Sequence, residues 1–270
     1  MSTITTTAAI RTAGTRGVTP GGVLRSEWLK LVTVRSTFWT TLVALLLAGG
    51  ISLLAGSVLS AERASSGTAL QVVTTGILTF VALVVGVLGV LSIGGEYATL
   101  QIRSSDAAVP ARWPVPVAKG VVVGAWSFVL GLVVTFGSYG LLALLLGGKG
   151  VAVRFDGDTV GALVGGAAYL ALIAAFSVGL GTLVRASAAG ITVVAALLFV
   201  APIIVRLFAA LTGADWLSTV DHYLLSNAGG VLFAAKGTAT IELWAALVAL
   251  ACWLAAVWVP ALVLTMRRDV

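Results

Sequence analysis

The charged side chains that could do chemistry are few, and several gather in one polar segment between two long apolar stretches. The segment begins at Gly95-Glu96-Tyr97 and ends at Lys119. Its central carboxylates are Glu96 and Asp106, and no histidine lies near them in the sequence. An active site built on a carboxylate and histidine cluster is therefore not indicated. A polar segment of this length must lie in water, where a soluble partner can bind it.

Other catalytic patterns are also missing from the sequence. Lys149 follows Gly148 but precedes Gly150, and it lacks the upstream glycine of an ATP-binding P-loop. The single histidine, His222, cannot form a metal cluster alone, and the single cysteine, Cys252, cannot form an intrachain disulfide. We therefore expect no catalytic residue, no metal site and no cofactor on this chain.

The rest of the chain has the composition of a membrane protein. It is 59% hydrophobic and 10% charged, with a mean hydropathy of +1.11, whereas about a quarter of the residues in a soluble domain are charged. Six stretches reach the roughly 20 apolar residues that a spanning helix needs: Phe38–Leu59, Leu70–Ile93, Val121–Leu146, Val160–Val184, Ile191–Leu211 and Ile241–Met266. They are apolar all round and too long for membrane strands, which predicts an all-α integral membrane protein with six transmembrane helices.

Basic residues predict the orientation, because Lys and Arg are more frequent in cytoplasmic loops. With the N-terminus inside, five of the 16 basic residues lie outside, and the other eleven lie inside. We therefore expect a multi-pass protein of the cell membrane with both termini and residues 94–119 in the cytoplasm. The net charge of +6 suits anionic membrane lipid, and the scattered basic residues argue against a nucleic-acid partner.

The N-terminal region divides into a tail and a candidate surface helix. Residues 1–21 are rich in Thr, Ser, Ala and Gly and lack the apolar core of a signal peptide, which predicts a disordered cytoplasmic tail. Residues 22–270 are expected to form a single domain. Leu24, Trp28 and Leu31 recur at helical spacing beside basic residues, which predicts an amphipathic helix at the membrane interface. The alternative is a plain extension of the first span.

The polar segment contains a candidate docking helix. Ala98–Val109 has no helix breaker before Pro110. Thr99, Arg103 and Asp106 share one face of this helix, and Ala98, Ile102 and Val109 lie on another, apolar face. Such a helix can dock in a groove of a soluble partner or lie on the lipid head groups.

The segment before the last span, Asp215–Thr240, is more apolar than an exposed loop. Irregular backbone enters a membrane only where protein or a water cavity shields it. We expect two short helices joined near Asn227-Ala228-Gly229-Gly230 in a re-entrant segment, with a loop packed on the outer rim as the alternative. Arg206, late in the fifth stretch, either reaches the outer surface or contacts a substrate.

Three blocks of the chain resemble the ABC-2-type exporter permeases, in particular the single-domain permeases of high-GC actinobacteria. The blocks are Leu24–Leu31 with Arg35–Trp39, Gly95–Lys119 and Tyr223–Gly229. The chain departs from the family pattern at Leu100-Gln101, where the family usually has Gly-Thr, and at Asp106, where leucine is frequent. The resemblance implies a six-helix permease that pairs with a second or homologous permease. It also implies two copies of a separate ATPase that binds ATP and Mg.

The resemblance also implies a role for each block. The first is a connector helix with Leu24, Glu27, Trp28, Lys30 and Leu31. The second is an ATPase-coupling element with Glu96, Tyr97, Ile102, Arg103, Asp106 and Pro110. The third is a re-entrant outer gate with Tyr223, Ser226, Asn227 and Gly229.

The expected function is the permease subunit of an ATP-driven exporter that moves a hydrophobic or amphiphilic substrate (drug, antibiotic, lipid or peptide) out of the cell. The middles of the spans carry no ionisable residue, which argues against a proton- or sodium-coupled carrier. Two alternatives stay open, an integral-membrane enzyme of lipid metabolism and a non-transporting scaffold or immunity protein.

Overall fold

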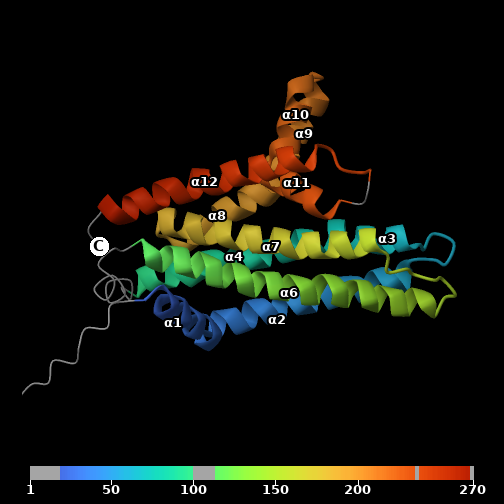
Figure 1. The fold of residues 1–270 in the computed structure, drawn as a ribbon. Helices are drawn as coiled ribbons and strands as arrows, with labels where there is room; N and C mark the ends of the chain where they lie inside the picture. Colours follow the sequence, from blue (N-terminus) through green and yellow to red (C-terminus); the bar gives the residue numbers. More distant parts are fainter. Residues whose placement is uncertain (1–18, 100–112, 235–236, 268–270) are drawn as a thin grey trace, which may run out of the picture.

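The computed structural model describes residues 19–99, 113–234 and 237–267, and every regular element in this part of the chain is a helix (Figure 1). Six helical stretches in it are long and apolar enough to cross a membrane: α2 (Arg35–Val58), Ser66–Ala98, α6 (Pro114–Gly147), α7 (Gly157–Val184), Ser187–Thr212 and α12 (Leu243–Arg267). The six predicted spans are therefore confirmed as helices. Most begin earlier than predicted, because helical turns with polar residues extend beyond the apolar core.

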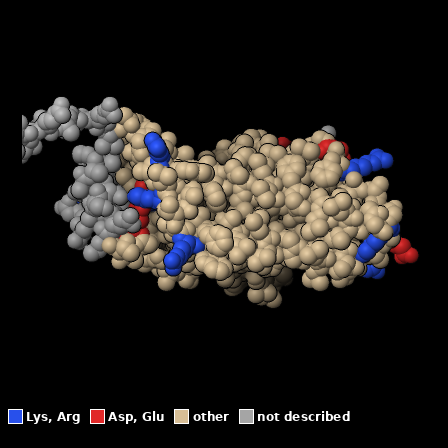
Figure 2. Space-filling view, turned by 90° about the horizontal axis from the view of Figure 1, so that it is seen from below, with Lys and Arg blue, Asp and Glu red and all other residues tan. Residues whose placement is uncertain are grey.

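The helices lie side by side along one axis, and α1 (Pro20–Thr33) and the end of α12 lie at the same end of the bundle (Figure 1). Charged side chains gather at both ends of the face in Figure 2, and its broad middle carries almost none. A bilayer requires such an uncharged belt, because a charged side chain in hydrocarbon costs about 3 kcal/mol or more. The described part therefore has the form of a multi-pass membrane protein.

The centre of the bundle is built from α4 (Leu78–Ala98), α6 and α7. Glycines bring these helices close together. A Cβ atom at Gly89 of α4 would lie 2.7 Å from the Ala174 carbonyl oxygen, and one at Gly131 of α6 would lie 2.7 Å from the Ala167 Cα. In lipid the hydrophobic effect does not drive helices together, so close packing at small residues is what holds them.

Two of the six helical stretches contain a π-helical turn. The second comprises α3 (Ser66–Gln71), the π-helix η1 (Val72–Ile77) and α4. The fifth comprises α8 (Ser187–Ala195), the π-helix η2 (Ala196–Val200) and α9 (Ala201–Thr212). Pro202 has no N–H and its ring clashes with the carbonyl four residues earlier, which accounts for the irregular turn before it. After this turn α9 leaves the bundle together with α10 (Asp215–Tyr223) (Figure 1).

The predicted amphipathic helix is present as α1, which starts at Pro20, two residues earlier than expected. Its first turn is capped by the Thr19 hydroxyl, which accepts a hydrogen bond from the Gly22 N–H. Residues 1–18, most of the expected tail, lie outside the described residues. Glu27 is buried on the inner face of α1, whereas Trp28 of the predicted apolar stripe is exposed.

The segment before α12 contains two short helices, α10 and α11 (Leu225–Gly230), followed by the short 3-10 helix η3 (Val231–Phe233). The chain bends between α10 and α11 at Leu224, whose backbone is extended (φ −62°, ψ 148°). The predicted joint at Asn227–Gly230 is therefore wrong, because these residues are helical. Packing holds the glycines in the helix, since Gly229 is buried against the ring of Tyr169.

Two glycines of α6 provide a test of the close packing. We expect Gly131→Ala to lower stability by about 1–3 kcal/mol, because its new methyl group would overlap the backbone of Ala167. Gly140→Ala on the same helix meets no atom within 4 Å and should be neutral or stabilising, because alanine is the better helix former. For each variant, the fraction of protein that stays monodisperse in detergent is followed as the temperature rises, and the midpoint of its loss reports the stability. Equal midpoints for the two variants would contradict the packing described here.

Candidate functional site

In the part of the chain that the structure describes, four charged side chains from three helices form a charge ring at the end of the bundle where α1 lies. Lys30 Nζ is 2.7 Å from Glu27 Oε1 and 3.1 Å from Glu96 Oε1. Lys119 Nζ is 3.0 Å from Glu96 Oε1 and also donates a hydrogen bond to Glu27 Oε2. Each carboxylate is therefore held by both lysines, and each lysine by both carboxylates.

Local sequence places each member of the charge ring. Glu27 and Lys30 are three residues apart on α1, the spacing at which helical side chains meet. Glu96 lies in the last turn of α4. Lys119 lies in the second turn of α6, because Pro114 stands at the start of that helix, where proline is favoured. The charge ring thus joins α1 to both helices that flank residues 99–113.

Three of the four charges are almost completely buried. The exposed fractions of Glu27, Glu96 and Lys119 are 3%, 6% and 4%. Removing such groups from water costs several kcal/mol each, and this cost is offset only when opposite charges and hydrogen bonds surround them. Burial lowers the pKa of Lys30, but the hydrogen bond and charge of Glu27 and the charge of Glu96 outweigh it, so its pKa is raised above 10.5. Lys30 is therefore held in its charged form.

A cavity of about 320 Å³ lies beside the charge ring. All four ring residues line it, together with side chains of α2 and of the last turns of α4. The second carboxylate oxygen of Glu96, Oε2, is buried and has no hydrogen-bond partner among the described residues. This end of the bundle is therefore polar inside as well as on its surface.

Tyr97 joins the same end of α4 to the end of α7. The Arg185 guanidinium carbon lies 5.3 Å from the centre of the Tyr97 ring, within the range of a cation–π contact. Arg185 caps α7 in the left-handed conformation (φ 57°), which is uncommon for a residue other than glycine. Glu96 and Tyr97 of the predicted coupling block thus contact three other helices. Glu96 binds side chains of α1 and α6, and Tyr97 contacts the capping residue of α7.

The connector residues divide between the two faces of α1. Glu27 and Lys30 belong to the charge ring, and Leu31 is buried beside it. Trp28 packs edge-on against Trp126 of α6, with ring centroids 5.8 Å apart. Leu24 is exposed. The structure therefore brings four of the five predicted connector residues onto the rest of the bundle.

Most of the predicted coupling helix lies outside the described residues. Ala98 ends α4 and Thr99 caps it. Residues 100–112, with Ile102, Arg103, Asp106 and Pro110, are not described. The docking helix therefore stays a prediction.

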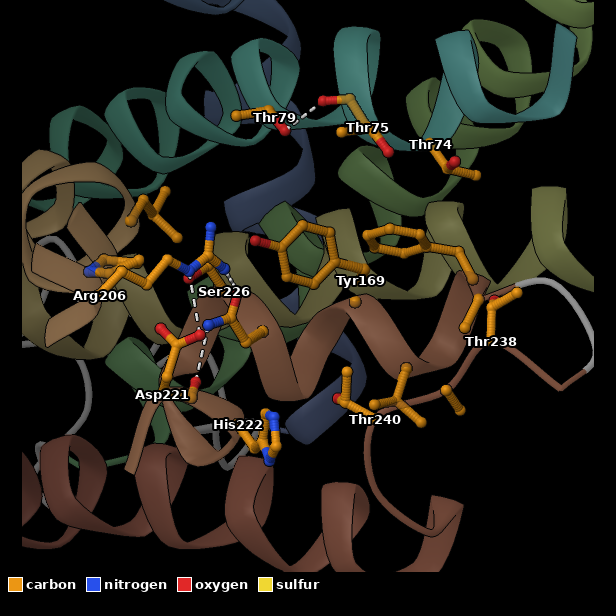
Figure 3. Close-up of a pocket in the computed structure, with 18 of the residues that line it drawn as sticks. Thr74, Thr75, Thr79, Tyr169, Arg206, Asp221, His222, Ser226, Thr238 and Thr240 are labelled. Atoms are coloured by element: carbon orange, nitrogen blue, oxygen red, sulfur yellow. Dashed lines mark hydrogen bonds and ion pairs between the residues drawn. The ribbon is translucent and has the colours of Figure 1, made fainter. Parts of the chain in front are cut away.

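The predicted outer-gate residues lie on α10 and α11, away from the charge ring, and two of them, Ser226 and Asn227, line a cavity together with Arg206 (Figure 3). Asn227 accepts a hydrogen bond from Arg206 Nη2 at 3.0 Å and donates one to the Asp221 carbonyl oxygen at 2.7 Å. Ser226 lines the same cavity, and Gly229 packs on the Tyr169 ring. The Tyr223 carbonyl oxygen accepts a hydrogen bond from Trp253 of α12.

No protein-family model matches this chain, and no curated protein matches it in sequence. Its function is therefore inferred from the geometry of the charge ring and of the cavity around Arg206, and from the three sequence blocks described above.

Two important residues were not predicted. Lys119 was expected in water at the end of the polar segment, whereas α6 carries it into the bundle. Pro114 and Pro116 are the pattern that could have shown this, since prolines mark a helix start and Lys119 follows within two turns. Asp221, the ion-pair partner of Arg206, carries no comparable signal, because fifteen residues and a helical hairpin separate the two.

Replacement of Lys119 tests the charge ring. Lys119→Met leaves both buried carboxylates to share Lys30, and breaking a buried ion pair in this way costs about 3–5 kcal/mol. We expect a matching fall in the thermal midpoint in detergent, with Arg25→Gln on the exposed face of α1 as a neutral control. Glu27→Gln combined with Lys119→Met should cost less than the sum of the two single changes, because the side chains interact. Additive effects would contradict the ring.

The raised pKa of Lys30 predicts a dependence on alkaline pH. A lysine with a raised pKa contributes stability that is complete below its ordinary value of 10.5 and is lost as pH rises through the raised value. We expect Lys30→Arg to keep more of its stability as pH rises above 10.5, because arginine stays protonated there. Thermal midpoints of both proteins across this range give the comparison, and parallel losses would rule out this role for Lys30.

Proposed function

We propose that this chain is the membrane permease subunit of an ATP-driven exporter of the ABC-2 type. A separate ATPase, in two copies, supplies the energy, and a second permease copy or a homologous permease completes the pathway. The observation that carries the proposal is the charge ring. It binds α1, the predicted connector helix, to both helices that flank the predicted docking segment.

The charge ring provides a mechanical connection. A force on residues 99–113 reaches the end of α4 at Glu96 and the start of α6 at Lys119. Because the ring ties both positions to α1, the three helices move as one unit. α4 and α6 are central helices of the bundle and both pack on α7, so this movement passes into the middle of the protein.

The proposal is consistent with the absence of an ATP-binding motif from this sequence. The chain carries no P-loop, and energy must then enter through a contact with another protein. In this proposal the charge-ring end faces the cytoplasm, both termini lie there, and the substrate leaves at the opposite end. The apolar helix faces suit a hydrophobic or amphiphilic substrate.

Purification of the tagged chain together with an ATPase encoded beside it tests the proposal. We expect the ATPase to co-purify, and we expect Arg103→Glu with Asp106→Arg to weaken its binding about tenfold or more, the loss typical of charges at a protein interface. Glu62→Arg with Arg63→Glu, exposed at the other end of the bundle, is the matched control and should bind normally.

Two outcomes count against this proposal in different ways. Failure of any ATPase to co-purify would contradict the exporter function and leave the lipid enzyme and the scaffold as the remaining candidates. Normal ATPase binding by the Arg103 and Asp106 variant would contradict the docking segment alone.

A further inference from the structure

A second cavity, of about 530 Å³, lies partway along the bundle, away from the charge ring and around Tyr169 and Arg206 (Figure 3). Its walls come from η1, the start of α4, α7, the junction of η2 and α9, the helices α10, α11 and η3, and residues 234 and 238–240. The volume lies within the roughly 300–1,000 Å³ of small-molecule sites. We refer to it as the outer cavity.

Both π-helices of the described chain border the outer cavity. η1 contributes Thr74 and Thr75, and η2 contributes Leu198 and Phe199. A π-helical turn is rare and occurs frequently at functional sites. Pro202 accounts for η2, but η1 contains no proline, and two such turns from separate spans at one cavity are typical of a binding site.

The charged groups of the outer cavity cancel one another. Arg206 Nε donates to Asp221 Oδ2 at 3.0 Å, and Arg206 Nη2 donates to Asn227 Oδ1 at 3.0 Å. The guanidinium is thereby fixed in the wall with its counter-charge beside it. A singly charged ligand would meet one favourable and one unfavourable charge, and an uncharged ligand meets no such conflict.

Several polar atoms of the outer cavity are ready to accept hydrogen bonds. Asp221 Oδ1 and Ser226 Oγ are buried without a partner among the described residues. The hydroxyls of Thr74 and Thr79 donate to backbone carbonyls of the preceding turn, which leaves their oxygen lone pairs as acceptors. Tyr169 lies between the threonines and Arg206, with its hydroxyl turned toward the Arg206 side in Figure 3. A ligand with several hydrogen-bond donors matches this wall.

The remaining wall is apolar. Leu198, Phe199, Ile203 and Phe233 line it, and α9 continues beyond it with exposed Ile204, Leu207 and Phe208. An apolar chain attached to the polar end of a ligand would therefore extend along α9. The outer cavity thus presents a polar wall and an apolar exit to the same molecule.

We infer that the outer cavity binds the head group of an amphiphile, and that this head group is uncharged and rich in hydroxyl groups, as in a glycosyl or polyol lipid. Hydroxyls donate to Asp221 Oδ1 and Ser226 Oγ and accept from Arg206, so one group satisfies both kinds of partner. The role of this amphiphile as exported substrate rests on the proposed function, whereas its binding does not.

The test uses four amphiphiles with the same decyl chain: decyl maltoside, decyl phosphocholine, decyltrimethylammonium and decyl sulfate. Each is titrated in radiolabelled form, below its micelle concentration, onto the permease in lipid nanodiscs, with empty nanodiscs subtracted. We expect saturable binding of decyl maltoside at least about tenfold tighter than that of the other three. Equal or tighter binding of a charged or zwitterionic probe, or no saturable binding above empty nanodiscs, overturns the inference.

Variants locate the binding. Ser226→Ala removes one hydroxyl and should weaken decyl maltoside binding about fivefold, and Asp221→Asn should weaken it more, because hydrogen bonds to charged groups are stronger. Asp215→Asn, on the same helix but exposed and outside the cavity, is the control and should bind like the parent. Unchanged binding by Ser226→Ala and by Asp221→Asn overturns the assignment to this cavity.

The two proposals fail separately. Tight maltoside binding by a permease that recruits no ATPase supports the site and contradicts the exporter. ATPase recruitment without saturable maltoside binding contradicts the site and leaves the exporter in place.

Discussion

Two carboxylates can remain charged inside the end of an apolar bundle only because two lysines share them. Replacing a buried ion pair by apolar side chains is often neutral or stabilising, so the value of the charge ring lies in geometry more than in stability. Lys30 can reach Glu96, and Glu27 can reach Lys119, in only one register of α1 against α4 and α6. The position of α1, the start of α6 and the two ends of the polar segment all depend on this one interaction.

The charge ring and the outer cavity differ in the way their charges are used. Among the described residues, every charge of the charge ring contacts two opposite charges, which suits the transmission of movement. In the outer cavity Asp221 and Ser226 keep buried oxygens unpartnered among the described residues, which suits the reception of a ligand. α7 connects the two sites, since Tyr169 lines the cavity and Arg185 caps the helix over Tyr97. It is therefore the element through which ATPase docking and ligand binding would influence each other.

Much of the fold could be predicted from the sequence, because spanning helices are recognised by length and apolar character alone. The sequence does not predict which face of each helix turns inward and which turns to lipid. Lipid and the protein interior are equally apolar, so the two faces leave no periodic pattern. For this reason the apolar stripe of α1 pointed to Trp28, whereas the inward residue is Glu27. The bend at Leu224 and the burial of Lys119 depend on contacts between distant segments, such as Gly229 with Tyr169, which the local sequence does not contain.

In the proposed exporter the charge-ring end faces the cytoplasm, where an ATPase can reach it. Cysteine labelling with a membrane-impermeant thiol reagent tests this most directly, after Cys252 is replaced by serine and one cysteine is introduced at Arg25 or at Glu62, both exposed and at opposite ends of the bundle. We predict that the cysteine at position 25 reacts only in inside-out vesicles and that the one at position 62 reacts only in intact cells. Labelling of position 25 in intact cells would contradict the account.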